Sequence, residues 1–305
     1  MRTTALTSLV LALCLAGAAA AQAPIQRGRA VAPDAAIRVF NLAGTVRVRA
    51  WERDSVDVTA VVPKGAGELL FGGGYSGVKL GMNPPVGEAT FPGALLEVRV
   101  PAGARLWVKS ESAEVLVSGL TGSVDLSTMS GRIVVTGSPS QLTAETMDGG
   151  IDAEVNSALV RLKSAGGAIA LRGAVTDASI STVGGAATAH LTNADRVLME
   201  AVGGSLSLDA APRHGGNYTL TSHSGDIAIR LPAEFDAALD LTALEGKVVN
   251  HATKRMATAA NKGKGESLYL VGGQGASDVV ARTFRGTITV SVQTAAPAPA
   301  SKGGN

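Results

Sequence analysis

Acidic and basic residues recur at a fixed spacing in the middle of the chain, and they are the residues that could do chemistry. Asp125 and Arg161 are 36 residues apart, and Glu145 and Lys163 are 18 residues apart. Such groups gathered on one β-face could bind a polysaccharide, or supply the acid and base that its cleavage requires. The alternative is a row of ion pairs on a solvated sheet, which contributes about 0.2–1 kcal/mol per pair and needs no function. We favour the ion pairs.

His223 occupies a position that is apolar in most of the equivalent segments. It could act as a base or a ligand, but a partly buried imidazole more often turns toward solvent or bonds turn backbone. His190, His214 and His251 do not stand at metal-ligand spacing from it. We therefore expect no catalytic, cofactor-binding or metal-binding residue. The surface candidates that remain are Glu145, Arg161, Lys163 and His223.

Three other chemical motifs are incomplete in this sequence. The segment 272–278, GGQGASD, resembles a calcium-binding nonapeptide, but it occurs once and that mechanism needs stacked copies. The glycines of residues 65–74 lack the Gly-Lys-Ser/Thr of a phosphate loop. No Gly-x-Ser-x-Gly elbow presents a serine nucleophile.

The 18-residue spacing extends over much of the chain and defines a repeat. Glycines recur at 18 residues, then at 19 to 21, with a last member 40 residues further on. The glycine series consists of Gly44, Gly131, Gly149, Gly167, Gly185, Gly204, Gly225, Gly246 and Gly286, with Ala113 in the equivalent place before Gly131. A period of this length indicates stacked supersecondary units.

Apolar residues keep fixed places on both sides of each glycine. They stand seven and five residues before it and two and four after it, as Leu142, Ala144, Ile151 and Ala153 do around Gly149. Period-two alternation on both sides of a corner predicts two short strands that meet at a bend. One unit cannot bury its own apolar face, so the units must stack. The predicted fold class is all-β, a β-solenoid with rungs of about 18–21 residues and glycine corners, and we expect it to be right-handed.

The corner carries two further recurring features. Three residues before the glycine stands a hydroxyl, as in Thr128 and Thr146, which we expect to bond nearby backbone at the bend. Two residues before it the position is mostly apolar, as in Met129 and Met147, and we expect a buried corner there. The glycine itself is expected to hold a positive φ, because a residue with a Cβ would clash.

The two ends of the chain predict a targeting segment and a tail. Residues 1–21 combine Arg2 with an apolar stretch and small residues before Gln22, as in a cleaved signal peptide. Cys14, the only cysteine, lies in this segment, where the bulky Leu13 disfavours lipidation. We expect a linker over 22–35, the solenoid over 36–293 with loop insertions at 64–93 and 250–266, and a disordered Ala/Pro-rich tail over 294–305.

Composition limits the choice of partner. The chain has 38 glycines, only 3% aromatic residues and a formal net charge of +2. Small side chains suit a thin repetitive core, and the near-neutral charge argues against nucleic acid or an anionic membrane surface as partner. No apolar stretch after the signal segment is long enough to span a membrane. We expect an exported protein, periplasmic or extracellular, whose partner is an envelope protein or a glycan.

Several segments together resemble the putative-adhesin, or Toastrack, domain family. They are FNLAGTVRVRAWERDSVDVTA (40–60), LEVRVPAGARLWVKS (96–110), SGLTGSVDLSTMSGRIVVTG (118–137), SHSGDIAIRLP (222–232) and TFRGTITV (283–290). The resemblance covers nearly all of residues 37–292. It implies a bacterial, exported or envelope-facing protein with a β-solenoid, and it supplies no catalytic residues.

The residues and the resemblance favour a non-enzymatic binding, adhesion or scaffold module at the cell envelope. Members of the family also occur beside envelope-stress signalling proteins. A signalling component that acts through a protein partner is therefore the alternative. A carbohydrate-active enzyme on a β-helix scaffold, which would use Glu145, Arg161 and Lys163, is the second alternative.

Overall fold

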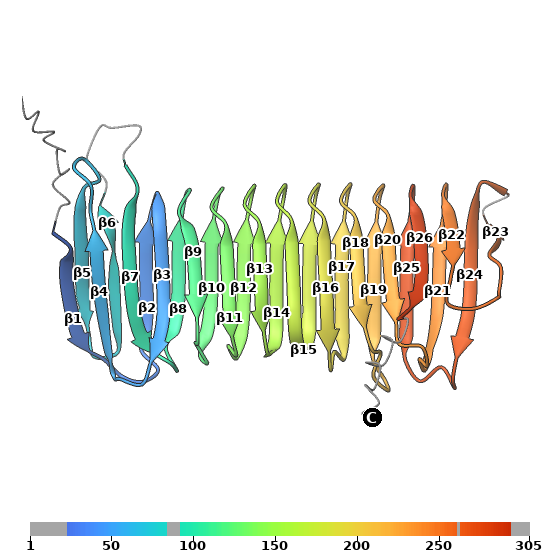
Figure 1. Ribbon diagram of the computed structural model, residues 1–305, viewed down its shortest axis with the longest axis horizontal. Helices are drawn as coiled ribbons and strands as arrows, with labels where there is room; N and C mark the ends of the chain where they lie inside the picture. Colours follow the sequence, from blue (N-terminus) through green and yellow to red (C-terminus); the bar gives the residue numbers. More distant parts are fainter. Residues whose placement is uncertain (1–22, 84–91, 261–262, 294–305) are drawn as a thin grey trace, which may run out of the picture.

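The computed structural model describes residues 23–83, 92–260 and 263–293, and over these ranges the chain is a β-solenoid of two facing sheets (Figure 1). Most rungs give one strand to each sheet, and equivalent strands of neighbouring rungs pair in parallel. None of the described residues lies in a helix that could cross a membrane. The predicted signal peptide and tail lie outside the described ranges, and the hand of the solenoid stays a prediction.

Sheet A runs from one end of the solenoid to the other. In spatial order its strands are β1 (Ile25–Ala30), β4 (Ser55–Val61), β7 (Ala94–Pro101), β3 (Gly44–Trp51), β9 (Glu114–Ser118), β11 (Ile133–Gly137), β13 (Ile151–Val155), the first half of β15 (Ile169–Thr182), β16 (Ala187–Thr192), β18 (Leu206–Ala210), β20 (Ile227–Leu231), β26 (Thr287–Val292) and β22 (Lys247–Asn250).

Sheet B faces it across the core. Its strands, in the same direction, are β5 (Glu68–Gly74), β6 (Gly77–Asn83), β2 (Ala36–Asn41), β8 (Arg105–Ser110), β10 (Ser123–Thr128), β12 (Gln141–Thr146), β14 (Ser157–Ser164), the second half of β15, β17 (Arg196–Ala201), β19 (Asn217–Ser222), β25 (Asp278–Thr283), β21 (Ala237–Ala243), β24 (Gly265–Gly272) and β23 (Thr258–Ala260).

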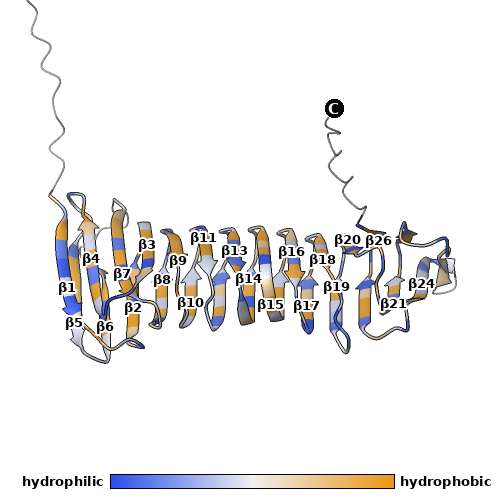
Figure 2. Cartoon of the chain, turned by 60° about the horizontal axis from the view of Figure 1, so that its bottom comes forward, coloured by the Kyte–Doolittle hydropathy of each residue, from blue (hydrophilic) through white to orange (hydrophobic). Residues whose placement is uncertain are grey.

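Pairing in register places each repeat position in a column along the solenoid. Leu142 of β12 lies beside Val124 of β10 on one side and Val160 of β14 on the other. These positions are buried, as are Ile133 and Ile151 in sheet A. Hydrophobic and hydrophilic residues alternate along the strands as a result (Figure 2). The apolar positions predicted on both sides of the glycine are confirmed as one continuous core.

Two rungs depart from the order of the sequence. Near the C-terminal end, β25 pairs with both β19 and β21, and β26 pairs with both β20 and β22. The rung of Gly286 therefore lies between those of Gly225 and Gly246 (Figure 1). After β20 the chain leaves the adjacent rung position empty and forms the rung of Gly246 and the antiparallel pair β21–β24. It then returns, and β25 and β26 occupy the position that was left. At the other end, the β2–β3 rung lies between β6–β7 and β8–β9.

The N-terminal end corrects two predictions about the domain plan. Residues 22–35, expected to form a linker, contain β1, which pairs antiparallel with β4 at the edge of sheet A. The expected loop insertion 64–93 contains the antiparallel hairpin β5–β6, so the loop assignment is wrong for those strands. Three consecutive glycines at the end of β5 hid it, because glycine carries no side chain whose alternation could be detected. In the described part of the insertion 250–266, the strand residues are the last residue of β22, all of β23 and the start of β24.

Most of the glycine series lacks the positive φ that was predicted, and this prediction is wrong. Within the series only Gly44 and Gly286 have it. At Gly149 the reason for glycine is the neighbouring rung, since a Cβ would stand well inside 3.0 Å of the carbonyl oxygen of Gly131. The later glycines up to Gly225 repeat this contact. Successive rungs therefore touch backbone to backbone at this corner.

The recurring hydroxyls bond backbone as predicted. The Gly149 N–H donates to Thr146 Oγ1 at 3.0 Å, and the Gly167 N–H donates to Ser164 Oγ at 2.9 Å. Both hydroxyls are buried. In β2 the equivalent residue is Asn41, whose side-chain amide donates to a backbone carbonyl of β7 at 3.2 Å. These polar groups hold the corners and do not form an exposed column of hydroxyls.

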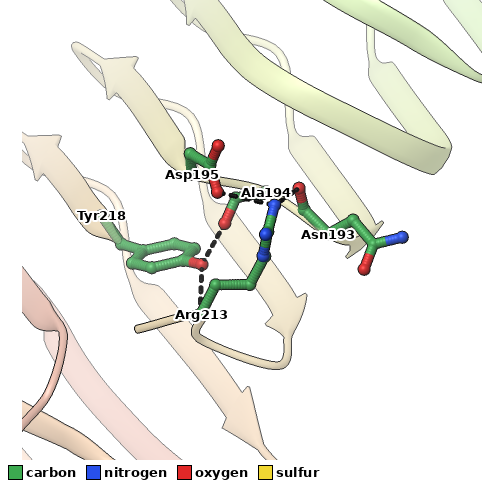
Figure 3. Close-up of polar contacts among 5 residues, drawn as sticks. All are labelled: Asn193, Ala194, Asp195, Arg213 and Tyr218. Atoms are coloured by element: carbon green, nitrogen blue, oxygen red, sulfur yellow. Dashed lines mark hydrogen bonds and ion pairs between the residues drawn. The ribbon is translucent and has the colours of Figure 1, made fainter. Parts of the chain in front are cut away.

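Tyr218 of β19 is the largest of the fully buried side chains. Its hydroxyl belongs to a polar cluster at the corner opposite the glycine series, near the start of β19 (Figure 3). Its hydroxyl donates to the Ala194 carbonyl and accepts from the Arg213 N–H at 3.1 Å. Arg213 also forms an ion pair with Asp195 at 2.8 Å. Burial raises the pKa of the Tyr218 hydroxyl, so it stays a neutral donor at ordinary pH.

Candidate functional site

The residues two places before each glycine form a column that we call the corner column. In spatial order it consists of Leu42, Glu111, Met129, Met147, Ala165, Val183, Val202, His223, Phe284 and Leu244. The prediction that this position is buried is wrong, because Met147 is 54% exposed and Val202 is 53% exposed. The apolar side chains of the corner therefore face solvent.

Strand alternation explains why the corner column points outward. In β12 the side chains of Leu142 and Thr146 are buried, so the buried hydroxyl takes the last inward place and Met147 falls on the outer side. The N–H groups of Met147 and Asp148 then donate to the Met129 carbonyl at 3.0 and 2.9 Å. Each corner is thus fixed to its neighbour while its side chain remains free. The outward direction of Met147 could have been predicted by continuing the inward–outward alternation from Leu142 to Thr146 and on to the next residue.

The corner column is long for an exposed apolar feature. From Met129 to Leu244 it covers eight rungs, which at about 4.8 Å per rung extend about 34 Å. Single exposed apolar side chains are ordinary on protein surfaces, whereas a contiguous row rimmed by polar residues marks an interaction site. This row is therefore the first candidate for a functional surface.

A central groove runs beside the corner column on the outer face of sheet B. Its second wall is formed by the charge column, which we define as the outward residues four places before each glycine. From β8 to β17 the charge column consists of Lys109, Ser127, Glu145, Lys163, Ser181 and Glu200. The groove is shallow, with a volume of ≈ 420 Å³, and its floor includes the buried hydroxyls of Thr128 and Thr146.

A second, distal groove lies over the rungs of Gly225, Gly286 and Gly246 and has a volume of ≈ 630 Å³. Its lining combines apolar and polar side chains, among them Ala201, Leu244, Phe284, Thr221, Thr242 and Arg282. The Arg282 guanidinium stands 3.5 Å from the carboxylate of Asp240, so the cation is balanced. The distal groove offers an apolar wall beside paired donors and acceptors.

His223 is exposed and continues the corner column as a flat ring. Its imidazole stacks on Phe284, with ring centroids 5.2 Å apart and planes 5° apart. The guanidinium of Arg285 lies 5.3 Å from the centroid of Phe284. In the ranges that the structure describes, no group of three His, Cys, Asp or Glu side chains could hold a metal ion. The imidazole contributes a ring face to the column, and a ligand role for it stays a prediction.

The structure brings together one of the two predicted charge pairs. Lys163 Nζ lies 3.4 Å from Glu145 Oε1 on the adjacent strand, which confirms the expected ion pair. Asp125 and Arg161 share one column but are two rungs apart, with Thr143 between them. Because the outer face of sheet B is open to solvent, the ion pair between Glu145 and Lys163 contributes little to stability. A role of Glu145, Arg161 and Lys163 in ligand binding stays a prediction.

Asp125 lies on the same outer face of sheet B, and its pKa is perturbed. Burial raises the pKa of its carboxyl, and the Glu145 carboxylate adds to the rise. Trp107 lies beside Asp125 on β8, and the Arg38 guanidinium stands 5.2 Å from the Trp107 ring centroid. Sequence reasoning missed this cation–π contact, because Arg38 and Trp107 are neighbours only once β2 and β8 pair.

The calcium-like segment 272–278 is a turn held by protein groups. Asp236 Oδ1 accepts hydrogen bonds from the N–H groups of Gln274 at 2.8 Å and Ala276 at 3.0 Å. The Ala276 bond, followed by that from Gln274, holds the pKa of Asp236 below its usual value. The glycines of this segment therefore serve a tight turn around a carboxylate.

A family model for Toastrack DUF4097 matches residues 96–291, which is more than half of the chain. The chain belongs to this family. The match begins within β7 and ends in β26, so it spans the central rungs and both grooves of the Toastrack solenoid. The resemblance carried by the sequence motifs is thereby confirmed. No curated protein sequence matched the chain.

Three solved structures from Parabacteroides species show a partial likeness to this chain. A putative adhesin from Parabacteroides distasonis is 14% identical with a TM-score of 0.44, covering 88% of this chain and 97% of that chain. A putative adhesin from Parabacteroides merdae is 13% identical with a TM-score of 0.42, covering 89% and 97%. A putative lipid binding protein from Parabacteroides distasonis is 10% identical with a TM-score of 0.40, covering 89% and 97%.

Proposed function

We propose that this Toastrack protein is an exported, non-enzymatic binding module of the cell envelope, and that the distal groove holds its ligand. The observation that carries the proposal is the exposed corner column. A solenoid built only as a spacer gains nothing from a row of corners in which Met129, Met147, Val183, Val202 and Leu244 face water, since such a surface favours association. Binding explains why the column is apolar.

The lining of the distal groove favours a glycan as the ligand. Leu244 and Phe284 supply an apolar wall for the carbon face of a sugar ring. Thr221, Thr242 and the Arg282 side chain supply hydroxyl and guanidinium groups that suit sugar hydroxyls. Because Asp240 balances Arg282, the groove does not select for a strong anion.

A glycan array probed with the full exported protein tests this proposal. We expect neutral glycans to bind, and we expect Arg282→Ala and Phe284→Ala each to weaken binding by about tenfold, the effect of one lost charged or apolar contact. Arg230→Ala is the matched control, because Arg230 is an exposed arginine of β20 in sheet A, away from the groove. An empty array, or equal binding by all three variants, would contradict the proposal.

A pull-down from the native envelope separates glycan binding from the signalling alternative. Capture of glycan-containing material that is lost in Phe284→Ala supports the proposed function. Capture of a membrane-bound regulator whose binding survives that substitution would favour the signalling role and count against the groove.

One observation supports the enzyme alternative. The pKa of Asp125 is raised, and a second carboxyl group, that of Glu145, lies on the adjacent strand beside Lys163; a pair of carboxyl groups is what glycoside cleavage uses. However, Asp125 is not among the residues that line the central groove. Turnover of any polysaccharide in a panel, abolished by Asp125→Asn, would establish the enzyme and overturn the non-enzymatic proposal.

A further inference from the structure

The outer face of sheet B is self-complementary about a point between the rungs of Gly149 and Gly167. The corner column changes from large to small at this point: Met129 and Met147 stand on one side, Ala165 and Val183 on the other. If the order is reversed, Met147 faces Ala165 and Met129 faces Val183. Each large side chain then meets a small one.

The charge column obeys the same reversal. Its order from β8 to β17 is Lys109, Ser127, Glu145, Lys163, Ser181 and Glu200. When this order is reversed about the same point, Lys109 faces Glu200 and Glu145 faces Lys163. Ser127 then faces Ser181. Every formal charge of this column faces its opposite. A shift of the reversal point by one rung toward the C-terminal end would instead place Glu145 against Glu200 and lose the match.

The next column outward gives an independent match. It contains Trp107 at the β8 end and Leu198 at the β17 end, and the reversal places these two apolar side chains opposite each other. Trp107 is 37% exposed, so the large ring is available for contact. The corner column and the charge column thus share one reversal point, which is also the centre of the central groove. In the third column the match is that of Trp107 with Leu198, and the charged residues Asp125 and Arg161 face Ser179 and Thr143.

We propose that a second copy of this chain docks on the central groove, related by a two-fold axis parallel to the strands between β12 and β14. Such an axis turns the second solenoid antiparallel to the first and lays equivalent columns against each other, as an isologous interface requires. Both copies have the same rung spacing of about 4.8 Å, so every pair stays in register along the contact. Opposed charges then fix the register and the antiparallel direction.

The contact is small for a stable dimer. Six rungs extend about 25 Å and three columns are about 20 Å wide, so the interface buries on the order of 1,000 Å² in total. This is the lower limit for a specific interface, and the twist of the sheets separates the copies beyond these rungs. The dimer is therefore concentration-dependent and not obligate.

The arrangement leaves all of the distal groove of each copy except its edge at Ala201 outside the contact. The groove begins at Ala201, at the edge of the six rungs, and extends away over the rungs of Gly225, Gly286 and Gly246. An antiparallel dimer carries its two distal grooves toward opposite ends. If the proposed function is correct, a polymeric glycan then binds with the gain in affinity of a two-site attachment. Only this last step rests on the proposed function.

Sedimentation velocity of the full exported protein, from nanomolar to high micromolar concentration, tests the proposal. We expect a monomer–dimer equilibrium that Lys109→Glu or Glu200→Lys weakens at least tenfold. We expect the double variant Lys109→Glu/Glu200→Lys to restore it. In one chain these residues are five rungs apart, about 24 Å, which exceeds the Debye length in physiological salt. The rescue therefore requires a second copy.

Matched variants keep the test decisive. Lys264→Glu makes the same charge change at an exposed site just before β24, outside the contact, and should leave the equilibrium unchanged. All three positions are exposed, so circular dichroism should show intact β-structure in every variant. A monomer at every concentration overturns the proposal. A dimer whose dissociation constant is unchanged by either single substitution also overturns it. So does a dimer that both single substitutions weaken and that the double variant does not restore.

Discussion

Gly149→Ala should be one of the most destabilising single-methyl changes in the solenoid. The added Cβ would stand well inside 3.0 Å of the Gly131 carbonyl oxygen, which is backbone of the neighbouring rung and not the end of a flexible side chain. The rungs must separate locally, an overpacking that costs about 1–3 kcal/mol. The same Cβ presses on Thr146 Oγ1, whose bond to the Gly149 N–H contributes about 1 kcal/mol. We expect a loss of about 2–4 kcal/mol in the free energy of unfolding.

Gly150→Ala is the matched control one residue away. A Cβ at Gly150 would meet the Ala168 carbonyl oxygen at 3.4 Å, an ordinary contact, and Gly150 does not have a positive φ. Removing a glycine from the unfolded chain there should leave stability unchanged or raise it by up to about 1 kcal/mol. The two variants differ in how closely the methyl group approaches the backbone of a neighbouring rung.

Equilibrium urea unfolding followed by circular dichroism measures both variants. Gly149→Ala should unfold at a lower urea midpoint than the unmodified protein, and Gly150→Ala at an equal or higher one. If Gly149→Ala unfolds at the same urea concentration as the unmodified protein, close backbone contact between rungs is not the reason for the glycine series. Hydrogen exchange then reports whether the loss is local to the Gly131 and Gly149 corners, as expected for a repeat protein.

Three further predictions concern hydrogen bonds and pH. Thr146→Ala leaves a buried N–H without its acceptor and should cost about 1–3 kcal/mol in urea unfolding, whereas Thr143→Ala on the outer face should cost less than about 0.5 kcal/mol. Tyr218→Phe should cost about 1–2 kcal/mol. Because burial raises the pKa of Tyr218, the unmodified protein should lose stability as pH rises above about 10, and the phenylalanine variant should not show that part of the loss. Because backbone N–H bonds lower the pKa of Asp236, its contribution is present above about pH 4 and lost as pH falls, so Asp236→Asn should flatten the acid side of a melting-temperature profile.

The repeat and its core could be predicted because they depend on local periodicity. Leu142 and Ile151 stand at fixed distances from Gly149, and parallel pairing in register then stacks each position on its equivalents. The hydroxyl of Thr146 was also predictable, since a side chain three residues from a bend can reach backbone by itself. The ion pair between Glu145 and Lys163 followed from the same period.

The rest depended on contacts that a single rung does not contain. The reason for Gly149 is the carbonyl of another rung, so the backbone angle expected from local turn chemistry was the wrong cause. The placement of Gly286 between Gly225 and Gly246 depends on the chain returning to a place that it had passed over. The outward direction of Met147 was within reach of the alternation, but its apolar character suggested the core.

The direction of the corner column is the claim on which the functional proposals depend, and methionine oxidation tests it most directly. Dilute peroxide is applied to the protein at nanomolar concentration, and peptide mass spectrometry follows each sulfoxide. Met256 is 82% exposed and Met199 is fully buried, so they give the fast and slow limits. The account predicts that Met129 and Met147 oxidise close to the rate of Met256. Oxidation of both at the slow rate of Met199 would show that the corners are core, and would contradict the account.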